Sequence, residues 1–343
     1  MNICIIGASG YSGVELIKIL AAHSAVNLKY VTSRSLAGQS VAEQVPQLSH
    51  ALKDLKFIAS DLNKLPALDA DIFFLALPHG VASTYAEVLV KAGKKVIDLS
   101  ADFRLNSAET YKEYYGQEHP NKELLANSVY VIPELTPKEK WHNQNLIACP
   151  GCYPTSIIVP LYPLLKEKVI PSNGIIANSY SGISGAGKKV EKTYMYCERD
   201  GSATAYGIPK HRHLSEIEEQ LSDANGNELL IQFNPHLAPM KRGILTTITL
   251  PSLPNTSEKM LLSILNKYYD DKPFVNILAK GKFPDTNHVV GTNRIDISLN
   301  YDPRTKNIII NSAEDNLLKG ASGQAVQIMN LLIGCKETEG LIA

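Results

Sequence analysis

The sequence has no excess of charge of either sign, few cysteines and no long apolar segment. Its 343 residues contain 34 Lys and Arg against 34 Asp and Glu, whereas a general nucleic-acid binder carries a basic excess or a basic stripe. No apolar segment reaches the ~20 residues that a bilayer-spanning helix needs, and the N-terminus lacks the basic segment of a signal peptide. We therefore expect a cytoplasmic protein without a nucleic-acid or membrane partner.

The five cysteines are odd in number and widely scattered, which is typical of free thiols in a reducing compartment and not of a disulfide framework. Cys149 and Cys152 form one CxxC pair. Zinc would need two further soft ligands at a compatible spacing, and neither a second CxxC nor a nearby histidine cluster supplies them, so we expect no metal. A redox dithiol stays open as an alternative.

Length and composition predict about two globular domains, because the chain is 44% hydrophobic and 20% charged. In the first half, short apolar segments alternate with helical patterns, which indicates βαβ units and a parallel sheet. The expected strands are residues 3–6, 28–32, 72–77, 96–99 and 145–149, and the expected helices are residues 14–20, 81–92 and 153–165.

After about residue 170 the apolar segments are separated by Gly, Pro and Ser, which favours a more antiparallel sheet with a few helices. The sequence contains neither an internal repeat nor a low-complexity tract. The expected elements are strands at 175–180, 229–233, 244–250, 296–301 and 307–311, a hairpin turn at 302–306, and a final helix at 321–332 with one buried face.

A glycine-rich loop follows the first expected strand and opens the first expected helix. Gly7, Gly10 and Gly13 give the pattern GxxGxxG, with Ser9, Tyr11 and Ser12 between them. Glycines allow a tight turn and a close backbone approach to a pyrophosphate, and the helix N-terminus then faces the phosphates with free N–H groups. A plain tight turn is the alternative, but the position between a strand and a helix favours a dinucleotide site.

The end of the second expected strand indicates which dinucleotide binds. NAD-binding chains tend to carry an acid about 20 residues after the glycines, for the ribose 2′-hydroxyl. This chain instead carries Ser33 and Arg34, which suit a 2′-phosphate, although Arg34 could also be an ordinary surface charge. The sequence therefore predicts NADP(H).

Two further segments carry residues suited to chemistry. Pro150 and Gly151 force a sharp turn that places Cys152 at the start of a helix, where the dipole and free N–H groups lower the pKa of a thiol and make it nucleophilic. Residues 210–217 (KHRHLSEI) put two histidines beside an arginine at the start of another helix; they could hold a base or merely cap that helix. His79 follows a parallel strand, where ligands bind in open α/β sheets.

These motifs together resemble the N-acetyl-γ-glutamyl-phosphate reductase family and, more distantly, the aspartate-semialdehyde dehydrogenases. The resemblance runs nearly end to end. Two positions depart from the family pattern: Cys149 stands where Asn is usual, and Ser156 fits only loosely a position that is usually small. The resemblance rests on residues 7–13, 77–80, 98–104, 150–155, 180–188, 210–217 and 315–320.

The resemblance implies an α/β fold: a Rossmann-type NADP-binding domain of residues 1–150 completed by the C-terminal helix at about 315–343, and a mixed α+β catalytic and oligomerisation domain of about residues 151–314, like that of glyceraldehyde-3-phosphate dehydrogenase. It implies an oxidoreductase of arginine biosynthesis that reduces an acyl phosphate and releases inorganic phosphate. Cys152 would form a thioester, His211 would be the acid/base, and Glu216 its orienting partner. A homo-oligomer, dimer or tetramer, is expected.

By the same resemblance, further residues should surround the two reactants. Those expected to bind the cofactor, beyond the glycine loop, Ser33 and Arg34, are Pro78, His79, Ser184, Gly185 and Asn316. Those expected to bind the substrate are Ser100, Arg104, Ser181, Gly182, Lys188 and Arg242. The alternatives are an aspartate-semialdehyde dehydrogenase, a carrier-protein-linked reductase of a lysine or ornithine pathway, and an NADP-binding redox sensor that uses Cys149 and Cys152.

Overall fold

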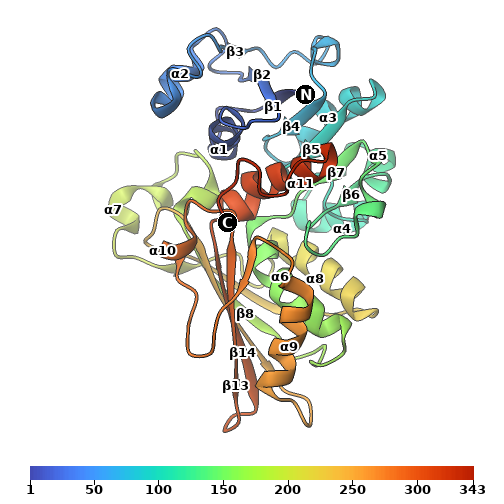
Figure 1. Ribbon diagram of the computed structural model, residues 1–343, viewed down its shortest axis with the longest axis vertical. Coiled ribbons are helices and arrows are strands. Elements are labelled where there is room, and N and C mark those ends of the chain that lie inside the picture. Colours follow the sequence, from blue (N-terminus) through green and yellow to red (C-terminus); the bar gives the residue numbers. More distant parts are fainter. The chain divides into compact units, whose positions relative to one another are not determined.

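The computed structural model describes residues 1–343, and the chain divides into two compact units (Figure 1). Unit 1 comprises Met1–Pro150 with Ala321–Leu341, and unit 2 comprises Gly151–Gly320 with Ile342–Ala343. Each unit is built on one seven-stranded sheet. The expected change from a parallel first half to a more antiparallel second half is confirmed.

The sheet of unit 1 is parallel throughout, in the order β3-β2-β1-β4-β5-β7-β6. All four residues of β4 are buried, as expected for a parallel strand that is covered on both faces. The chain moves outward from β1 to β3 and then returns to the other side of β1 with β4. The strands are β1 (Asn2–Ile6), β2 (Asn27–Thr32), β3 (Phe57–Ile58), β4 (Ile72–Leu75), β5 (Lys95–Asp98), β6 (Val129–Tyr130) and β7 (Leu146–Ala148).

Helices cover this sheet and include one from the far end of the sequence. Side chains of β1 alternate between two apolar clusters: Ile3 and Ile5 belong to the one that includes Met329, and Cys4 and Ile6 to the other. The C-terminal helix therefore completes the core of unit 1. The helices are α1 (Tyr11–Leu20), α2 (Val41–Gln44), α3 (Ala82–Lys91), α4 (Ala108–Tyr115), α5 (Lys122–Ala126) and α11 (Gly323–Ile333).

The sheet of unit 2 is mixed, in the order β12-β13-β14-β11-β8-β10-β9. The β8–β10 and β12–β13 pairs are parallel, and the other pairs are antiparallel. The hairpin expected at residues 302–306 joins β13 to β14 and is confirmed. The strands are β8 (Ile176–Ser181), β9 (Thr204–Ala205), β10 (Gln232–Leu237), β11 (Ile244–Pro251), β12 (Val275–Ile277), β13 (Ile295–Asp302) and β14 (Asn307–Glu314).

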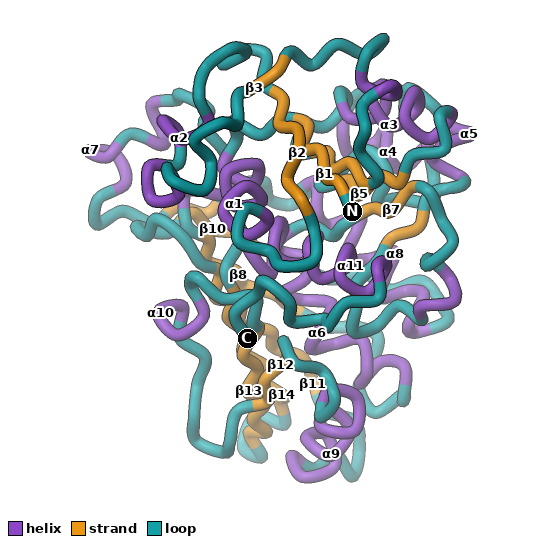
Figure 2. Tube along the Cα trace, turned by 45° about the horizontal axis from the view of Figure 1, so that its top comes forward, coloured by secondary structure: helices purple, strands orange, loops and turns teal.

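Helices α6, α8 and α9 form a layer on one face of this sheet (Figures 1 and 2). Nearly every residue of α6 is buried, because α6 contacts β11, β14 and both neighbouring helices. On the opposite face of β8, Ile176 and Tyr180 are exposed. The helices are α6 (Cys152–Lys166), α7 (Tyr196–Arg199), α8 (Arg212–Asn225), α9 (Glu258–Tyr269) and α10 (Thr286–Val289).

The strand expected at residues 229–233 is wrong in position, because β10 begins only at Gln232. The N–H of Leu229 donates to Ser222 Oγ and that of Ile231 to Glu218 Oε1. Side chains of α8 thus take the backbone groups that a strand would have used. Sequence reasoning also missed α9, the two-residue strands β3, β6 and β9 and the three-residue strand β12, whereas the strand expected at 145–149 is present as β7. No helix in the structure has both the length and the apolar character to cross a membrane.

Candidate active site

The glycine loop of unit 1 has the geometry that close packing demands. Gly7 has a φ of 84°, and a Cβ placed there would lie 2.4 Å from the carbonyl oxygen of Ala76. A Cβ at Gly13 would lie 2.6 Å from Cα of Ala8. Gly10 precedes α1 with no side-chain cap on that helix. The loop therefore exposes backbone and a helix N-terminus, which fits a pyrophosphate.

Four further residues expected at the cofactor follow the carboxyl ends of β2 and β4 in unit 1. Ser33 is buried and donates to Ser9 Oγ at 3.0 Å, whereas Arg34 beside it is exposed. Pro78 and His79 are exposed in the turn after β4, where the His79 ring lies 5.6 Å from that of Tyr115. This arrangement leaves Arg34 available to a ligand at the end of β2.

Ser100 and Arg104, both expected at the substrate, belong to a buried network in unit 1. Ser100 donates its N–H and its hydroxyl to the Asp98 carboxyl, and burial raises the pKa of Asp98 to about 7. Arg104 Nε donates to the carbonyl oxygen of Cys149 and its Nη2 to that of Leu99, both at 2.8 Å. Arg104 therefore ties together the ends of β5 and β7, and its contact with substrate stays a prediction.

Unit 2 begins with the turn that carries the expected nucleophile. Helix α6 starts at Cys152, and the preceding Gly151 is extended and offers no side-chain cap. The N–H of Gly151 donates to Oε1 of Glu216 at 2.7 Å. Cys152 is partly exposed, whereas Cys149 is fully buried and burial raises the pKa of its thiol. Of these two thiols, only that of Cys152 is accessible to solvent.

His211 lies just before the first residue of α8 and is enclosed by aromatic rings. Its Nδ1 accepts the N–H of His213, and the rings of Tyr153 and Tyr206 lie 5.6 Å and 5.4 Å from its own. Burial, and then the Arg212 charge, lower the pKa of His211 to about 4. The imidazole is therefore neutral at pH 7, and because Nδ1 accepts, we assign its proton to Nε2.

Glu216 lies one turn further along α8 and is almost fully buried. Its carboxylate accepts the Gly151 N–H and so ties α8 to the start of α6. That hydrogen bond holds the backbone of Gly151, the residue directly before Cys152. The expected role of Glu216 as the orienting partner of His211 stays a prediction.

The loop after β8 packs against the segment that follows β14. Gly182 approaches Arg242 so closely that a Cβ would lie 2.5 Å from the Arg242 nitrogen. Asn316 donates to Ser184 Oγ at 3.0 Å and accepts the Gly243 N–H at 2.7 Å. Ser181, Gly182, Ser184, Gly185 and Asn316 are thus brought together, whereas Lys188 is exposed beyond the 3₁₀ turn Ile183–Ala186.

Arg242 forms an ion pair inside unit 2. Its Nε lies 2.6 Å from Oδ2 of Asp315, whose side chain is fully buried. Asp315 also accepts the N–H groups of Gly291 and Leu317. The carboxylate therefore holds the guanidinium in one place, and the expected substrate contact of Arg242 stays a prediction.

Sequence reasoning missed two residues beside Cys152. A Cβ placed on Gly320 would lie 2.7 Å from Cβ of Cys152 and 3.0 Å from Oε1 of Glu314. Glu314 is fully buried at the end of β14. The only signal for Glu314 in the sequence was its position directly before the 315–320 motif. Sequence reasoning also missed Tyr206, which packs on His211 and which no motif indicated.

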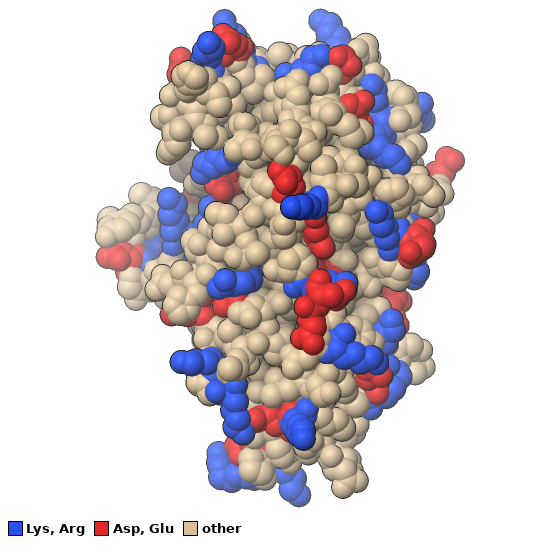
Figure 3. Space-filling view, in the orientation of Figure 1, with Lys and Arg blue, Asp and Glu red and all other residues tan.

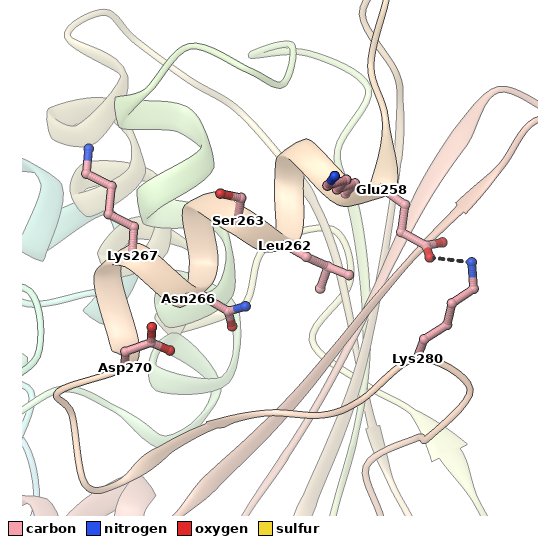
Figure 4. Close-up of a pocket in the computed structure, with 8 residues that line it drawn as sticks. Glu258, Leu262, Ser263, Asn266, Lys267, Asp270 and Lys280 are labelled. Carbon is pink, nitrogen blue, oxygen red and sulfur yellow. Dashed lines mark ion pairs between the residues drawn. The ribbon is translucent and has the colours of Figure 1, made fainter.

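Elsewhere on unit 2, an open depression runs along the exposed side of α9 (Figure 4). Glu258 at one end pairs with Lys280 at 3.0 Å. The depression contains none of the expected site residues. On the face drawn in Figure 3, acidic and basic side chains are interspersed. The depression is lined by Glu258, Lys259, Leu262, Ser263, Asn266, Lys267, Asp270 and Lys280.

Two family models match the chain. Residues 2–142 match the semialdehyde dehydrogenase NAD-binding domain, and residues 152–316 match the semialdehyde dehydrogenase dimerisation domain. The N-acetyl-γ-glutamyl-phosphate reductase of Akkermansia muciniphila is 46% identical over 342 residues, which is 99% of this chain and 98% of that protein. That of Alkaliphilus metalliredigens is 44% identical over 338 residues, 98% of this chain and 96% of that protein.

The chain belongs to the N-acetyl-γ-glutamyl-phosphate reductases of the semialdehyde dehydrogenase family. The reductase fold also matches the crystal structure of aspartate semialdehyde dehydrogenase II from Vibrio cholerae complexed with ASA, with a TM-score of 0.73 and 17% identity, covering 97% of this chain and 98% of that one. The enzyme from Candida albicans with NADP matches with a TM-score of 0.72 and 16% identity, over the same shares of the two chains. The expected family, fold class and oxidoreductase class are confirmed.

Proposed function

We propose that this reductase converts N-acetyl-γ-glutamyl phosphate to N-acetylglutamate 5-semialdehyde and inorganic phosphate, with NADPH, as a step of arginine biosynthesis. The observation that carries the proposal is the placement of Cys152: a partly exposed thiol on the first residue of α6, followed by Tyr153, whose ring packs on the neutral His211. The 42–46% identity of full-length relatives named for this substrate supports it.

The first step forms a thioester. The Cys152 sulfur, as the thiolate, attacks the γ-carbonyl carbon, a C–S bond forms, and the C–O bond to the phosphate group breaks with its electron pair on the departing phosphate. The free N–H groups at the start of α6 favour the thiolate. The glycine-rich segment 181–188, with Lys188 beside it, offers N–H donors and a positive charge for the leaving phosphate.

The second step is reduction of that thioester. NADPH, when bound, would supply the hydride for the thioester carbonyl carbon; a carboxylate carbon would accept a hydride less readily. Nε2–H of His211 donates to the developing oxyanion, because the neutral ring keeps its proton there. The tetrahedral oxyanion, held by the Nε2–H of His211, then collapses: its C–O bond becomes the C=O of the aldehyde, the C–S bond breaks, and the thiolate of Cys152 leaves.

Selection of NADPH over NADH is assigned to Arg34. Arg34 is exposed at the end of β2, next to the buried Ser33 that anchors the turn on Ser9. A guanidinium binds a phosphate in bidentate fashion, and the position of an acid that would repel a 2′-phosphate is taken here by Ser33. Either Arg104 or Arg242 is assigned to the substrate carboxylate, and each is held in place by contacts within its own unit.

The protein is proposed to act as a homodimer that pairs through the open face of the unit 2 sheet. Ile176 and Tyr180 are exposed on β8, and the Tyr180 ring stacks at 4.6 Å on His236 of β10. This face of the sheet carries exposed apolar side chains and is not covered by the helix layer, so it is the surface that a second copy would cover. The match of this unit to a dimerisation domain supports the assignment.

One assay tests the activity in its reverse direction. NADP⁺ reduction at 340 nm is followed with N-acetylglutamate semialdehyde and with aspartate semialdehyde, each with and without inorganic phosphate, and then with NAD⁺. The proposal expects turnover with the N-acetyl substrate that requires phosphate and prefers NADP⁺. A preference for aspartate semialdehyde, or turnover that ignores phosphate, would contradict it.

A further inference from the structure

A buried carboxyl group, that of Glu314, and the side chain of Cys152 lie against the same glycine, Gly320. Glu314 is the last residue of β14, and its pairing partners on the neighbouring strands are the apolar Ile244 and Ile295. The Cys152 Cβ and Glu314 Oε1 both lie within 3.0 Å of the position that a Gly320 Cβ would occupy. Gly320 therefore leaves room for the acid and the thiol to approach each other.

A second carboxyl group is bonded to the same turn. Glu216 on α8 accepts the Gly151 N–H, one residue before Cys152. Both glutamates are buried to 1% exposure or less. The start of α6 therefore has three groups that can carry negative charge, namely two carboxyls and one thiol, and burial makes several adjacent anions costly.

Positive charge at this place is limited. Lys319 is a buried cation in the turn next to Gly320, with Nζ 5.8 Å from the centre of the Phe274 ring. His211 is neutral at pH 7 because its pKa is lowered to about 4. Arg242 is paired with Asp315. Arg212, whose charge also lowers the pKa of His211, is exposed at the start of α8.

Two tyrosine hydroxyls near the start of α6 stay protonated at neutral pH. Burial raises the pKa of the Tyr153 hydroxyl on α6 and that of the Tyr206 hydroxyl, which donates to Tyr153. The ring of His213 lies 5.1 Å from that of His211.

We propose that Glu314 controls the protonation of Cys152, because the carboxyl and the thiol share one negative charge over the neutral pH range. In the resting enzyme the charge lies mainly on the stronger acid, Glu314, and the thiol is protonated. When the thiolate forms, its proton passes to the Glu314 carboxylate, so no second buried anion is created. Glu314 thus accepts and holds the proton of the Cys152 thiol. It does not contact the substrate and affects the reaction only through the sulfur.

This inference rests on the proposed nucleophile, but its test needs no turnover. The rate at which iodoacetamide labels Cys152 is measured from pH 5 to pH 10 in the substrate-free enzyme, with the labelled residue assigned by peptide mapping. In Glu314→Gln the thiol titrates without a competing carboxylate. The midpoint of the labelling profile should therefore fall by at least about one pH unit, which is about tenfold more thiolate below both midpoints.

Asp296→Asn is the matched control. Asp296 is a buried acid on β13, paired in register with Ala313, one residue before Glu314, and so it lies on the other face of the sheet. The control should leave the midpoint where it is. An unchanged or raised midpoint in Glu314→Gln, or an equal fall in both variants, would overturn the proposal.

A measurement on the unaltered chain covers the case in which Glu314→Gln does not fold. Thiolate absorbance at 240 nm is titrated for the wild type and for Cys152→Ser, and the difference belongs to Cys152. Because Glu314 takes the first negative charge, the thiol should ionise above its ordinary pKa of about 8.5. A midpoint at or below that value would contradict the proposal. Turnover that survives Cys152→Ser would instead contradict the proposed thioester, which neither titration addresses.

Discussion

The two cysteines of the CxxC pair lie on either side of one Pro-Gly turn, and the structure gives them opposite surroundings. Cys149 follows strand β7, is fully buried, and has a raised pKa because of that burial. Cys152 begins helix α6 and is partly exposed. Identical side chains three residues apart therefore differ in exposure because one follows a parallel strand and the other starts a helix, and we expect them to differ in reactivity.

The largest expected effect is the difference in kcat between the variants in which Cys152 or Cys149 is replaced by serine. Cys152→Ser should lower kcat by ~10⁴-fold or more, because a serine hydroxyl is not ionised at neutral pH and its ester accepts hydride less readily. Cys149→Ser, and Cys149→Asn, should keep most of the turnover. The measurement is steady-state NADP⁺ reduction, with peptide mapping after one equivalent of iodoacetamide. First labelling at Cys149 would contradict the assignment and revive a redox role for the pair.

The same contrast explains what the sequence could predict. The turn, the helix start at Cys152 and the glycine loop depend on local chain geometry, so spacing alone located them. Glu314 and Gly320 reach Cys152 only because β14 and the turn after it pack against α6. Such contacts join residues more than 150 positions apart, and no periodicity in the sequence encodes them.

A second lesson comes from the arginines. Arg104 and Arg242 were expected at the substrate because guanidinium groups suit carboxylates, and each proves to be held by partners within its own unit. A motif indicates that a residue matters, but the partner it binds depends on tertiary structure. The strand misplaced at 229–233 has the same cause, since side chains of α8 compete for its backbone.

The next largest effect should separate the two histidines at the start of α8, His211 and His213. His211→Asn should lower kcat by ~10²–10⁴-fold, the usual contribution of a positioned acid/base, with NADPH affinity retained. His213→Asn should do less, because its contact with the His211 Nδ1 uses the backbone N–H, which the variant keeps. Steady-state kinetics with cofactor titration measures both. Losses in the reverse order would assign the acid/base to His213.

A smaller effect is expected in unit 1, at the cofactor. A charge-assisted contact of Arg34 with a 2′-phosphate contributes ~1.5–3 kcal/mol, so Arg34→Ala should weaken NADPH binding by ~10–150-fold. NADH has no such phosphate and should bind unchanged. Fluorescence titration with both cofactors gives the two dissociation constants. Equal weakening of NADPH and NADH would contradict the role assigned to Arg34.

The smallest effects should appear in the pH dependence of stability. Asp98 in unit 1 has a raised pKa and His211 in unit 2 a lowered one, so the two groups change the stability in opposite directions as the pH rises. Asp98 has a folded pKa raised to about 7 by burial, above its ordinary 3.8. It therefore binds its proton more tightly in the folded protein, and its contribution to stability is present below pH 3.8 and lost as the pH rises toward 7. His211 has a folded pKa lowered to about 4 from 6.5, so its contribution is present above pH 6.5 and lost as the pH falls toward 4.

Thermal unfolding from pH 4.5 to 7 therefore separates the two groups. Asp98→Asn removes the component that favours low pH, so the variant should lose less stability than the wild type as the pH rises. His211→Asn removes the component that favours high pH, so its stability should depend less on acidification. Each group can change the free energy of unfolding by at most ~1.4 kcal/mol per pH unit within its window, which amounts to a few degrees in Tm for a chain of this size. Parallel shifts of both variants, with the slope against pH unchanged, would mean that neither group titrates in the window assigned to it.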